Sequence, residues 1–251
     1  MLIFSIFKVL HIIAGFTALL VFWIPVVTKK GGKAHVRSGW VYVWAMGAVA
    51  ISALVMGIWR IGFDPQKTGE SVAFAWFLIF IAILSLATAW YGIRVLRYKN
   101  RKAAHRHAID LLFPALLLLS GGAMSLYGAS IGFTLLTWFP FIGIFLGASQ
   151  LWYWLRAPGR KLHWWFEHLG GMLGCCIATI TAFTVFGAPR LLGLSSVHPL
   201  VWFMPTIVLV PCIIGFSRYY QKNSISRKAF ERSAWRATKC CAPARSIRKF
   251  C

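Results

Sequence analysis

Histidines and carboxylates begin two apolar segments of this chain, at spacings that could support chemistry. Residues 163–174, HWWFEHLGGMLG, begin one segment with two histidines and one of only five acidic residues in the 251-residue sequence. His163, Glu167 and Gly171 are spaced i, i+4 and i+8, so a helix places them on one face. The spacing predicts a polar face at the start of an apolar helix.

The second segment begins in a similar way. His107, Asp110 and Pro114 are spaced i, i+3 and i+7 and also share a helical face. An ionisable side chain at the centre of a membrane helix costs about 2.5–3.5 kcal/mol and therefore often marks a functional site. Imidazole and carboxylate together suit a divalent metal, a proton relay or an anionic substrate. The sequence offers four candidate metal ligands: His107, Asp110, His163 and Glu167.

A different set of histidines is suited to a haem. His11 lies near the middle of the first apolar segment, and imidazole is a common axial ligand of haem iron. The second ligand must come from a facing helix at a similar depth. His168 is the deepest candidate, although counting 1.5 Å per residue leaves a mismatch in depth of roughly 5–10 Å. His35 and His105 complete the candidate cofactor ligands.

Simpler interpretations of these side chains remain open. A packed, hydrogen-bonded histidine is the favoured interpretation of His11, and Glu167 could be a counter-charge for His168 or an arginine. Four histidines close to basic residues could instead lie among lipid headgroups: His35, His105, His107 and His163.

The composition indicates a helical membrane protein. Hydrophobic residues make up 59% of the chain, well above the roughly 45–50% of soluble domains. Charged residues make up only 13% and fall in short blocks, whereas the surface helices of a soluble protein need polar faces. The sequence therefore predicts an all-α fold, a polytopic bundle of transmembrane helices.

Seven segments have the length and hydropathy of transmembrane helices, which need ~20 residues to cross a ~30 Å hydrocarbon core. We predict them at Leu2–Val27, Trp40–Ile61, Val72–Leu96, Ala108–Ala129, Phe133–Leu155, Trp164–Phe186 and Pro199–Tyr220. Residues 1–220 then form the transmembrane domain. Residues 221–251 form a basic tail, expected to be disordered or to lie on the membrane surface.

The distribution of Lys and Arg predicts the orientation. The first, third and fifth connections and the tail carry most of the basic residues, whereas the second, fourth and sixth carry few. Because basic connections stay in the cytoplasm, we expect the N-terminus outside and the C-terminus inside. The net charge of +22 then needs no nucleic-acid partner. We expect the bilayer as the partner, with anionic lipid headgroups attracting the basic connections and tail by about 1 kcal/mol per basic residue.

Four stretches resemble an uncharacterised family of predicted bacterial membrane proteins. They are HIIAGFTALL at 11–20, KKGGKAHVRSGWVYVWAM at 29–46, KAAHRHAID at 102–110 and EHLGGMLGCCIATITAF at 167–183. The resemblance extends over residues 11–186 and leaves the tail uncovered. It implies a protein of the bacterial inner membrane and brings no activity, because the family is defined by sequence alone.

Three classes of function follow from these observations. The favoured one is a His-lined protein that binds a b-type haem or a divalent metal. A transporter or small-molecule binder would use the polar layer near the cytoplasmic face, although no inverted repeat is visible. A role in membrane assembly is the third. A zinc-dependent seven-helix hydrolase is disfavoured, since such enzymes have the opposite orientation and their ligand motifs are absent.

The orientation can be tested with a topology reporter fused at Ser226. The reporter should be cytoplasmic, because the basic connections hold their side of the bundle inside the cell. A periplasmic reporter contradicts the predicted orientation.

Overall fold

The computed structural model describes residues 2–193, 199–215 and 217–218, and every regular element in this part of the chain is helical. The chain divides into two compact units, Met1–Thr206 and Ile207–Cys251, each of which is considered by itself. The prediction of an all-α fold is confirmed for the described residues. The predicted basic tail at 221–251 lies outside them.

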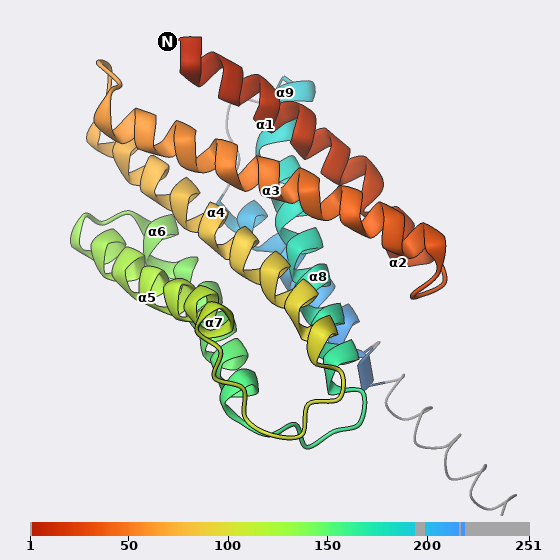
Figure 1. Cartoon of the computed structure of the whole chain (residues 1–251). Helices are drawn as coiled ribbons and strands as arrows, with labels where there is room; N and C mark the ends of the chain where they lie inside the picture. Colours follow the sequence, from red (N-terminus) through yellow and green to blue (C-terminus); the bar gives the residue numbers. More distant parts are fainter. Residues whose placement is uncertain (1, 194–198, 216, 219–251) are drawn as a thin grey trace, which may run out of the picture. The chain divides into compact units, whose positions relative to one another are not determined.

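The helices of the first unit follow one another along the chain with short connections (Figure 1). Their bounds are α1 Leu2–Val21, α2 Trp23–Val27, α3 Lys33–Gly62, α4 Gly69–Arg94, η1 Val95–Tyr98, α5 Ala108–Ser130, α6 Thr134–Trp138, α7 Pro140–Leu155, α8 His163–Ala182, η2 Phe183–Gly187, α9 Ala188–Leu191 and η3 Pro199–Trp202.

Six helical stretches within the described residues are long and apolar enough to cross a membrane. They are Leu2–Val27, Lys33–Gly62, Gly69–Tyr98, Ala108–Ser130, Thr134–Leu155 and His163–Leu191. Each coincides with one of the first six predicted segments. The main difference in bounds is that α3 begins at Lys33 rather than Trp40. Its first two turns carry Lys33, His35 and Arg37, which lower the hydropathy without interrupting the helix.

The seventh predicted segment is only partly helical among the described residues. A short 3₁₀ turn at Pro199–Trp202 precedes an apolar helix at Met204–Gly215. This helix is shorter than the ~20 residues that cross a hydrocarbon core. The seventh span and the orientation therefore stay predictions.

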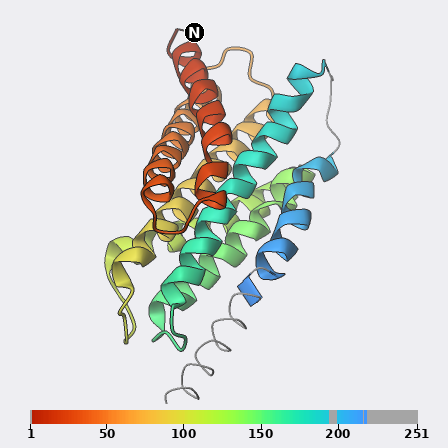
Figure 2. The same cartoon turned by 90° about the vertical axis from the view of Figure 1, so that its right-hand side faces the viewer.

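Helix α4 is the central element of the first unit. In its most apolar stretch of 18 residues, 56% of the residues are buried, whereas the corresponding share in the other five candidate spans is 17–33%. It packs against α3, α5 and α8, while α1 covers α3 and α7 covers α5 (Figures 1 and 2). Phe77 and Phe80 of α4 form the main core with Leu117, Leu136 and Phe139. Side chains from several helices are therefore positioned by their contacts with α4.

Some glycines allow two helices to come into close contact, but not every pair of glycines with GxxxG spacing does so. Gly143 and Gly147 of α7 are spaced in this way, and a Cβ on Gly147 would lie 2.7 Å from the Pro114 carbonyl oxygen. Gly170 and Gly174 of α8 have the same spacing, but each has open space around it. The residue of α8 in close contact is their neighbour Gly171, as described below.

The outer surface of the bundle is apolar. Trp44, Leu119 and Phe145, on three different helices, are 70–72% exposed. Many other large apolar side chains are exposed as well, and extensive apolar surface on a protein marks a region covered by a partner or by lipid. This exposed apolar surface agrees with the presence of six helices that are long and apolar enough to cross a membrane.

The contact at Gly147 can be tested by substitution. Gly147→Ala should lower the apparent melting temperature in detergent by several degrees. The new methyl group must displace the backbone of α5, and overpacking of this kind costs about 1–3 kcal/mol. Gly122→Ala is the matched control, because a Cβ there meets nothing within 4 Å and alanine favours the helix. Equal melting temperatures for the two variants would contradict the close α5–α7 contact.

Candidate functional site

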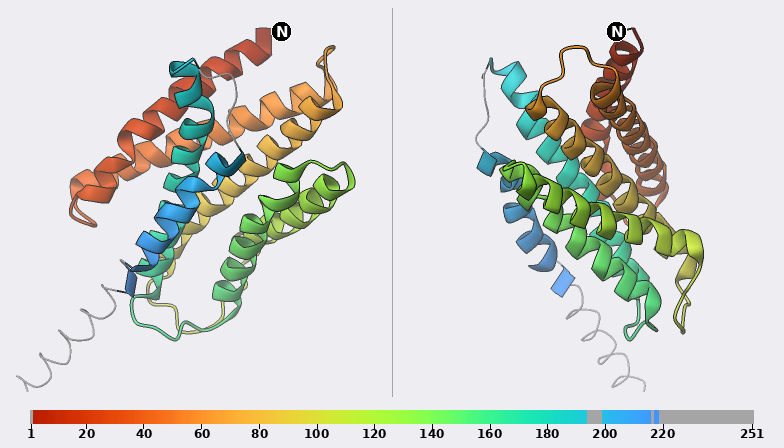
Figure 3. Two further views of the ribbon diagram at one scale, coloured as in Figure 1. Left: turned by 180° about the vertical axis from the view of Figure 1, so that it is seen from behind. Right: turned by 90° about the vertical axis from the view of Figure 1, so that its left-hand side faces the viewer.

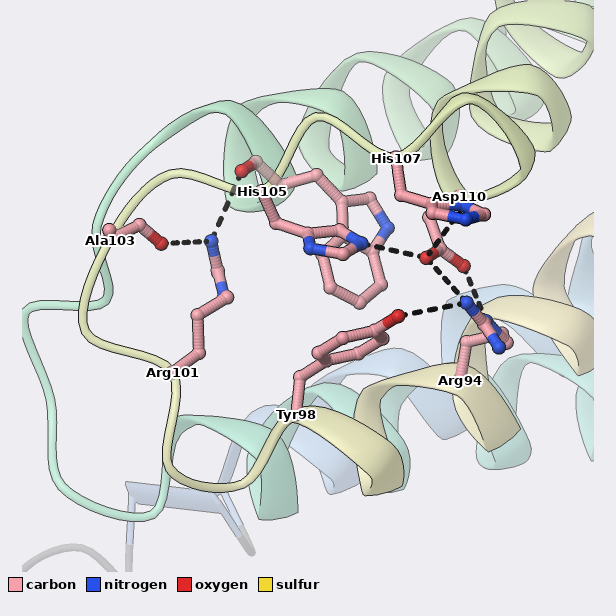
Figure 4. A network of polar contacts seen from close by, with 8 residues as sticks. Arg94, Tyr98, Arg101, Ala103, His105, His107 and Asp110 are labelled. Atoms are coloured by element: carbon pink, nitrogen blue, oxygen red, sulfur yellow. Dashed lines mark hydrogen bonds and ion pairs between the residues drawn. The ribbon is translucent and has the colours of Figure 1, made fainter.

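The predicted polar layer separates into several groups in the structure. The first is centred on Asp110 in the first turn of α5, whose side chain is fully buried (Figure 4). The Arg94 guanidinium donates to both carboxylate oxygens, with 2.7 Å between Nη2 and Oδ2. His105 Nε2 donates to Oδ2 at 2.7 Å. His107 is half exposed, with Nδ1 3.8 Å from Oδ2. Protein donors thus engage both carboxylate oxygens.

Sequence reasoning missed Arg94 as the partner of Asp110. The two residues lie at opposite ends of the connection between α4 and α5, so no helical spacing relates them. Arg94 also donates to the Tyr98 hydroxyl at 3.0 Å. A bidentate arginine–carboxylate pair of this kind fixes the geometry of both side chains. We interpret the pair as a structural connection between α4 and α5.

Arg101 stabilises the end of α7. Its guanidinium donates to the carbonyl oxygens of Tyr153 at 2.8 Å, Trp154 at 3.1 Å and Arg156 at 2.8 Å (its contact with Ala103 is shown in Figure 4). The last carbonyls of a helix have no partner within the helix, and a basic side chain satisfies them here. The His105 amide donates to the same Trp154 carbonyl at 2.7 Å. The two basic connections at 99–107 and 156–162 are thereby joined.

Glu167 and His163 have other partners. The Tyr91 hydroxyl donates to Glu167 Oε2 at 2.6 Å, and His163 Nδ1 lies 2.8 Å from the Tyr153 hydroxyl. The structure does not bring together the four predicted metal ligands His107, Asp110, His163 and Glu167. Within residues 2–193, 199–215 and 217–218, no group of three or more His, Cys, Asp or Glu side chains could hold a metal ion.

Two histidines from distant parts of the sequence do meet. The rings of His35, in the first turn of α3, and His168, in the second turn of α8, have centroids 6.4 Å apart and an interplanar angle of 69°. His35 Nδ1 lies 2.9 Å from the Pro25 carbonyl oxygen, and His168 Nδ1 lies 2.7 Å from the Gly92 carbonyl oxygen. Both residues are among the predicted cofactor ligands.

These hydrogen bonds determine the state of each ring. A carbonyl oxygen only accepts hydrogen bonds, so the Nδ1 atoms of His35 and His168 must carry the proton. In the neutral imidazole, Nε2 then keeps its lone pair. Neither Nε2 atom has a hydrogen-bond partner in the part of the chain that the structure describes. Each ring is thus fixed through Nδ1 by a backbone carbonyl oxygen.

Local backbone features place this pair. Gly31 has φ +76° and Gly32 is the N-cap of α3, so the chain turns sharply between α2 and α3 and His35 reaches the Pro25 carbonyl. On the other side, a Cβ on Gly171 would lie 2.9 Å from the Gly92 Cα atom. This close approach of α8 to α4 allows His168 to bond the Gly92 carbonyl.

Lys30 places a positive charge beside the pair. Its ammonium group donates to the Pro25 carbonyl oxygen at 2.8 Å and also to the Val26 carbonyl oxygen. The Pro25 oxygen therefore accepts from both Lys30 and His35. Partial burial lowers the pKa of Lys30.

His11 lies elsewhere, so the predicted pairing of His11 with His168 is not what the structure forms. His11 Nδ1 is 3.1 Å from the Val49 carbonyl oxygen and 3.0 Å from Ser52 Oγ. Val49 and His35 are about 14 residues apart on α3, or roughly 21 Å along the helix. His11 is thus far in depth from the ring that contacts His168. It lies instead in the wall of a cavity of about 640 Å³ between α1, α3, α4 and α8.

No protein-family profile matches this chain, and neither a curated protein nor a solved structure matches it. The resemblance of four stretches to predicted bacterial membrane proteins therefore stays a prediction.

The role of Asp110 can be tested through stability. Asp110→Asn should lower the free energy of unfolding by about 3 kcal/mol or more, since removing one partner leaves the other charge buried without compensation. Unfolding in mixed detergent micelles, followed by circular dichroism, measures this change.

Asp64→Asn is the matched control. Asp64 lies 3.9 Å from Arg60 Nε, and the Arg60 side chain is 40% exposed, so the loss of this pair should cost no more than about 1 kcal/mol. If both variants lost a similar free energy of unfolding, the buried Arg94–Asp110 pair would not stabilise the protein more than the exposed Arg60–Asp64 pair.

Proposed function

We propose that this chain is a bacterial inner-membrane protein that binds a b-type haem, which His35 and His168 would hold. The observation that supports it is the pair of rings 6.4 Å apart, each held through Nδ1 by a backbone carbonyl. Such outer hydrogen bonds fix the tautomer and orientation of a ligating imidazole. Both residues lie on helices long and apolar enough to cross a membrane.

The ring separation fits one metal between two imidazoles. A metal–imidazole bond is about 2.0–2.1 Å long, and each ring nitrogen lies roughly 1 Å from its ring centroid. Two Nε2 atoms that share one metal therefore hold their ring centroids roughly 6 Å apart. The separation between His35 and His168 is close to this value.

The donor set favours haem over a bare divalent metal. Protein zinc sites use three or four His, Cys, Asp or Glu ligands, and the described residues contain no group of three. Haem iron takes four nitrogens from its own macrocycle and needs only axial ligands from the protein. A pair of histidines is thus a complete protein contribution for haem and an incomplete one for zinc.

The surroundings of the pair suit an anionic cofactor. Lys30 lies beside His35 through their shared acceptor on Pro25, and Lys99 lies 4.6 Å above the Trp164 ring, near the start of α8. Haem carries carboxylates that basic side chains neutralise. Lys30 and Lys99 belong to the end of the bundle that carries the basic connections, and the sequence predicts this end to be cytoplasmic.

When bound, the haem supplies one-electron redox chemistry. The contribution of this chain would be to hold the two imidazoles in one tautomer and at a fixed separation. The Pro25 and Gly92 carbonyl oxygens do so by accepting hydrogen bonds from the Nδ1–H groups, which leaves the Nε2 atoms for the metal.

Absorption spectra and metal analysis of the detergent-purified protein test the proposal. Protein expressed with adequate haem supply should show a Soret band and one equivalent of iron. His35→Ala and His168→Ala should each lose most of the bound haem or convert it to a high-spin form, because each removes one ligand.

His11→Ala is the matched control. His11 also bonds a backbone carbonyl through Nδ1 but lies at a different depth, so this variant should keep the wild-type spectrum. Gel filtration confirms that all three variants remain folded. Three results would contradict haem ligation by this pair. The wild-type protein could be colourless, or it could contain a stoichiometric amount of zinc in place of iron. The third is an unchanged spectrum in both His35→Ala and His168→Ala.

A further inference from the structure

A large apolar cavity lies in the half of the bundle that contains the N-terminus, away from His35 and His168. Its volume is about 640 Å³, and its walls come from α1, α3, α4, α8, η2 and α9. Helices α1 and α8 separate toward this end (Figures 2 and 3). Most of the lining is aliphatic or aromatic, including Ile12, Phe16, Leu78 and Phe183. The volume lies within the ~300–1,000 Å³ range of small-molecule sites.

Basic side chains from three different elements line the same cavity. Lys8 belongs to α1, Arg60 to the last turn of α3 and Arg190 to α9. In the described part of the chain, Lys8 and Arg190 form no ion pair, whereas Arg60 lies 3.9 Å from Asp64 and over the ring of Phe4, 5.6 Å from its centroid. Basic side chains from three elements thus line one cavity, and among them Arg60 has a carboxylate nearby.

This combination is poorly explained by folding alone. Clustered like charges repel one another, and charges beside an apolar surface are costly to desolvate. An anionic group placed among them would relieve both effects. The apolar interior behind them would at the same time accept a hydrocarbon chain. The chemistry of the ligand is therefore that of an amphiphile with an acidic head.

We infer that this cavity binds a single-chain fatty acid, with the carboxylate among Lys8, Arg60 and Arg190 and the chain inside the cavity. A guanidinium group binds a carboxylate through two parallel hydrogen bonds, and two such groups are present. One chain suits the volume of the cavity, whereas the two chains of a phospholipid require more space. This site is independent of the proposed haem site, because no residue is shared.

Binding can be measured with cis-parinaric acid, a fluorescent long-chain carboxylate, added to the full-length protein after delipidation and transfer to amphipol. The wild-type protein should bind one equivalent, and palmitate should displace it. Hexadecanol, which has the same chain and no charge, should compete at least tenfold more weakly. Arg60→Gln and Arg190→Gln should each weaken binding by about tenfold, since each removes charge-assisted hydrogen bonds.

A pair of glycine variants tests the cavity itself. Gly15 lines the cavity, and a Cβ there meets nothing within 4 Å, so Gly15→Phe should fill the space and abolish binding. Gly122→Phe introduces the same side chain on α5, outside the cavity, at a glycine that also has open space around it. It should bind as the wild-type protein does.

Three outcomes would overturn the proposal. Equal competition by hexadecanol and palmitate would show that only the apolar chain is recognised. Stronger displacement by phosphatidylglycerol than by palmitate would identify a phospholipid site. Unchanged binding in Gly15→Phe, with the variant still monodisperse, would place the probe outside this cavity. The haem spectrum of the same preparations is unaffected by any of these results, so the two proposals fail separately.

Discussion

Polar side chains on these apolar helices have to find their partners within the protein, and this constraint determines how the helices are arranged. Asp110 is fully buried and is held by Arg94 and His105. Glu167 accepts from Tyr91, and His168 donates to Gly92. An unsatisfied polar group in such surroundings costs several kcal/mol. Each pairing therefore specifies which turn of one helix lies beside which turn of the next.

Helix α4 provides most of these partners. Tyr91, Gly92 and Arg94 lie within one turn of it, and they reach α8 on one side and α5 on the other. Gly92 also allows α8 to approach closely at Gly171. A single turn of the central helix thus positions both the structural ion pair and one histidine of the proposed haem site. A change in the packing of this turn would affect both.

The two proposed sites make different demands on the fold. The His35–His168 pair depends on hydrogen bonds to backbone carbonyls, which hold the rings in one tautomer. The cavity near His11 depends instead on the separation of α1 from α8 and on small residues such as Gly15 and Ala178 in its wall. Rigid packing at one end of the bundle and open space at the other are compatible, because α1 rests mainly on α3.

The sequence alone determined the helical class and the six long apolar helices. Hydropathy and helix length are properties of contiguous residues, so each segment is recognisable without its neighbours. It also identified the histidines and carboxylates of the polar groups, although not their partners Tyr91, Arg94 and Arg101. The sequence did not determine which of these residues meet in the fold. His35 and His168, or Arg94 and Asp110, are matched by the rotation and depth of separate helices, which no local spacing encodes. The expected pairing of His11 with His168 followed from the depth of single segments. The tertiary structure decided that His35, and not His11, lies beside His168, because α3 and α8 both pack against α4. It left His11 in the wall of a cavity.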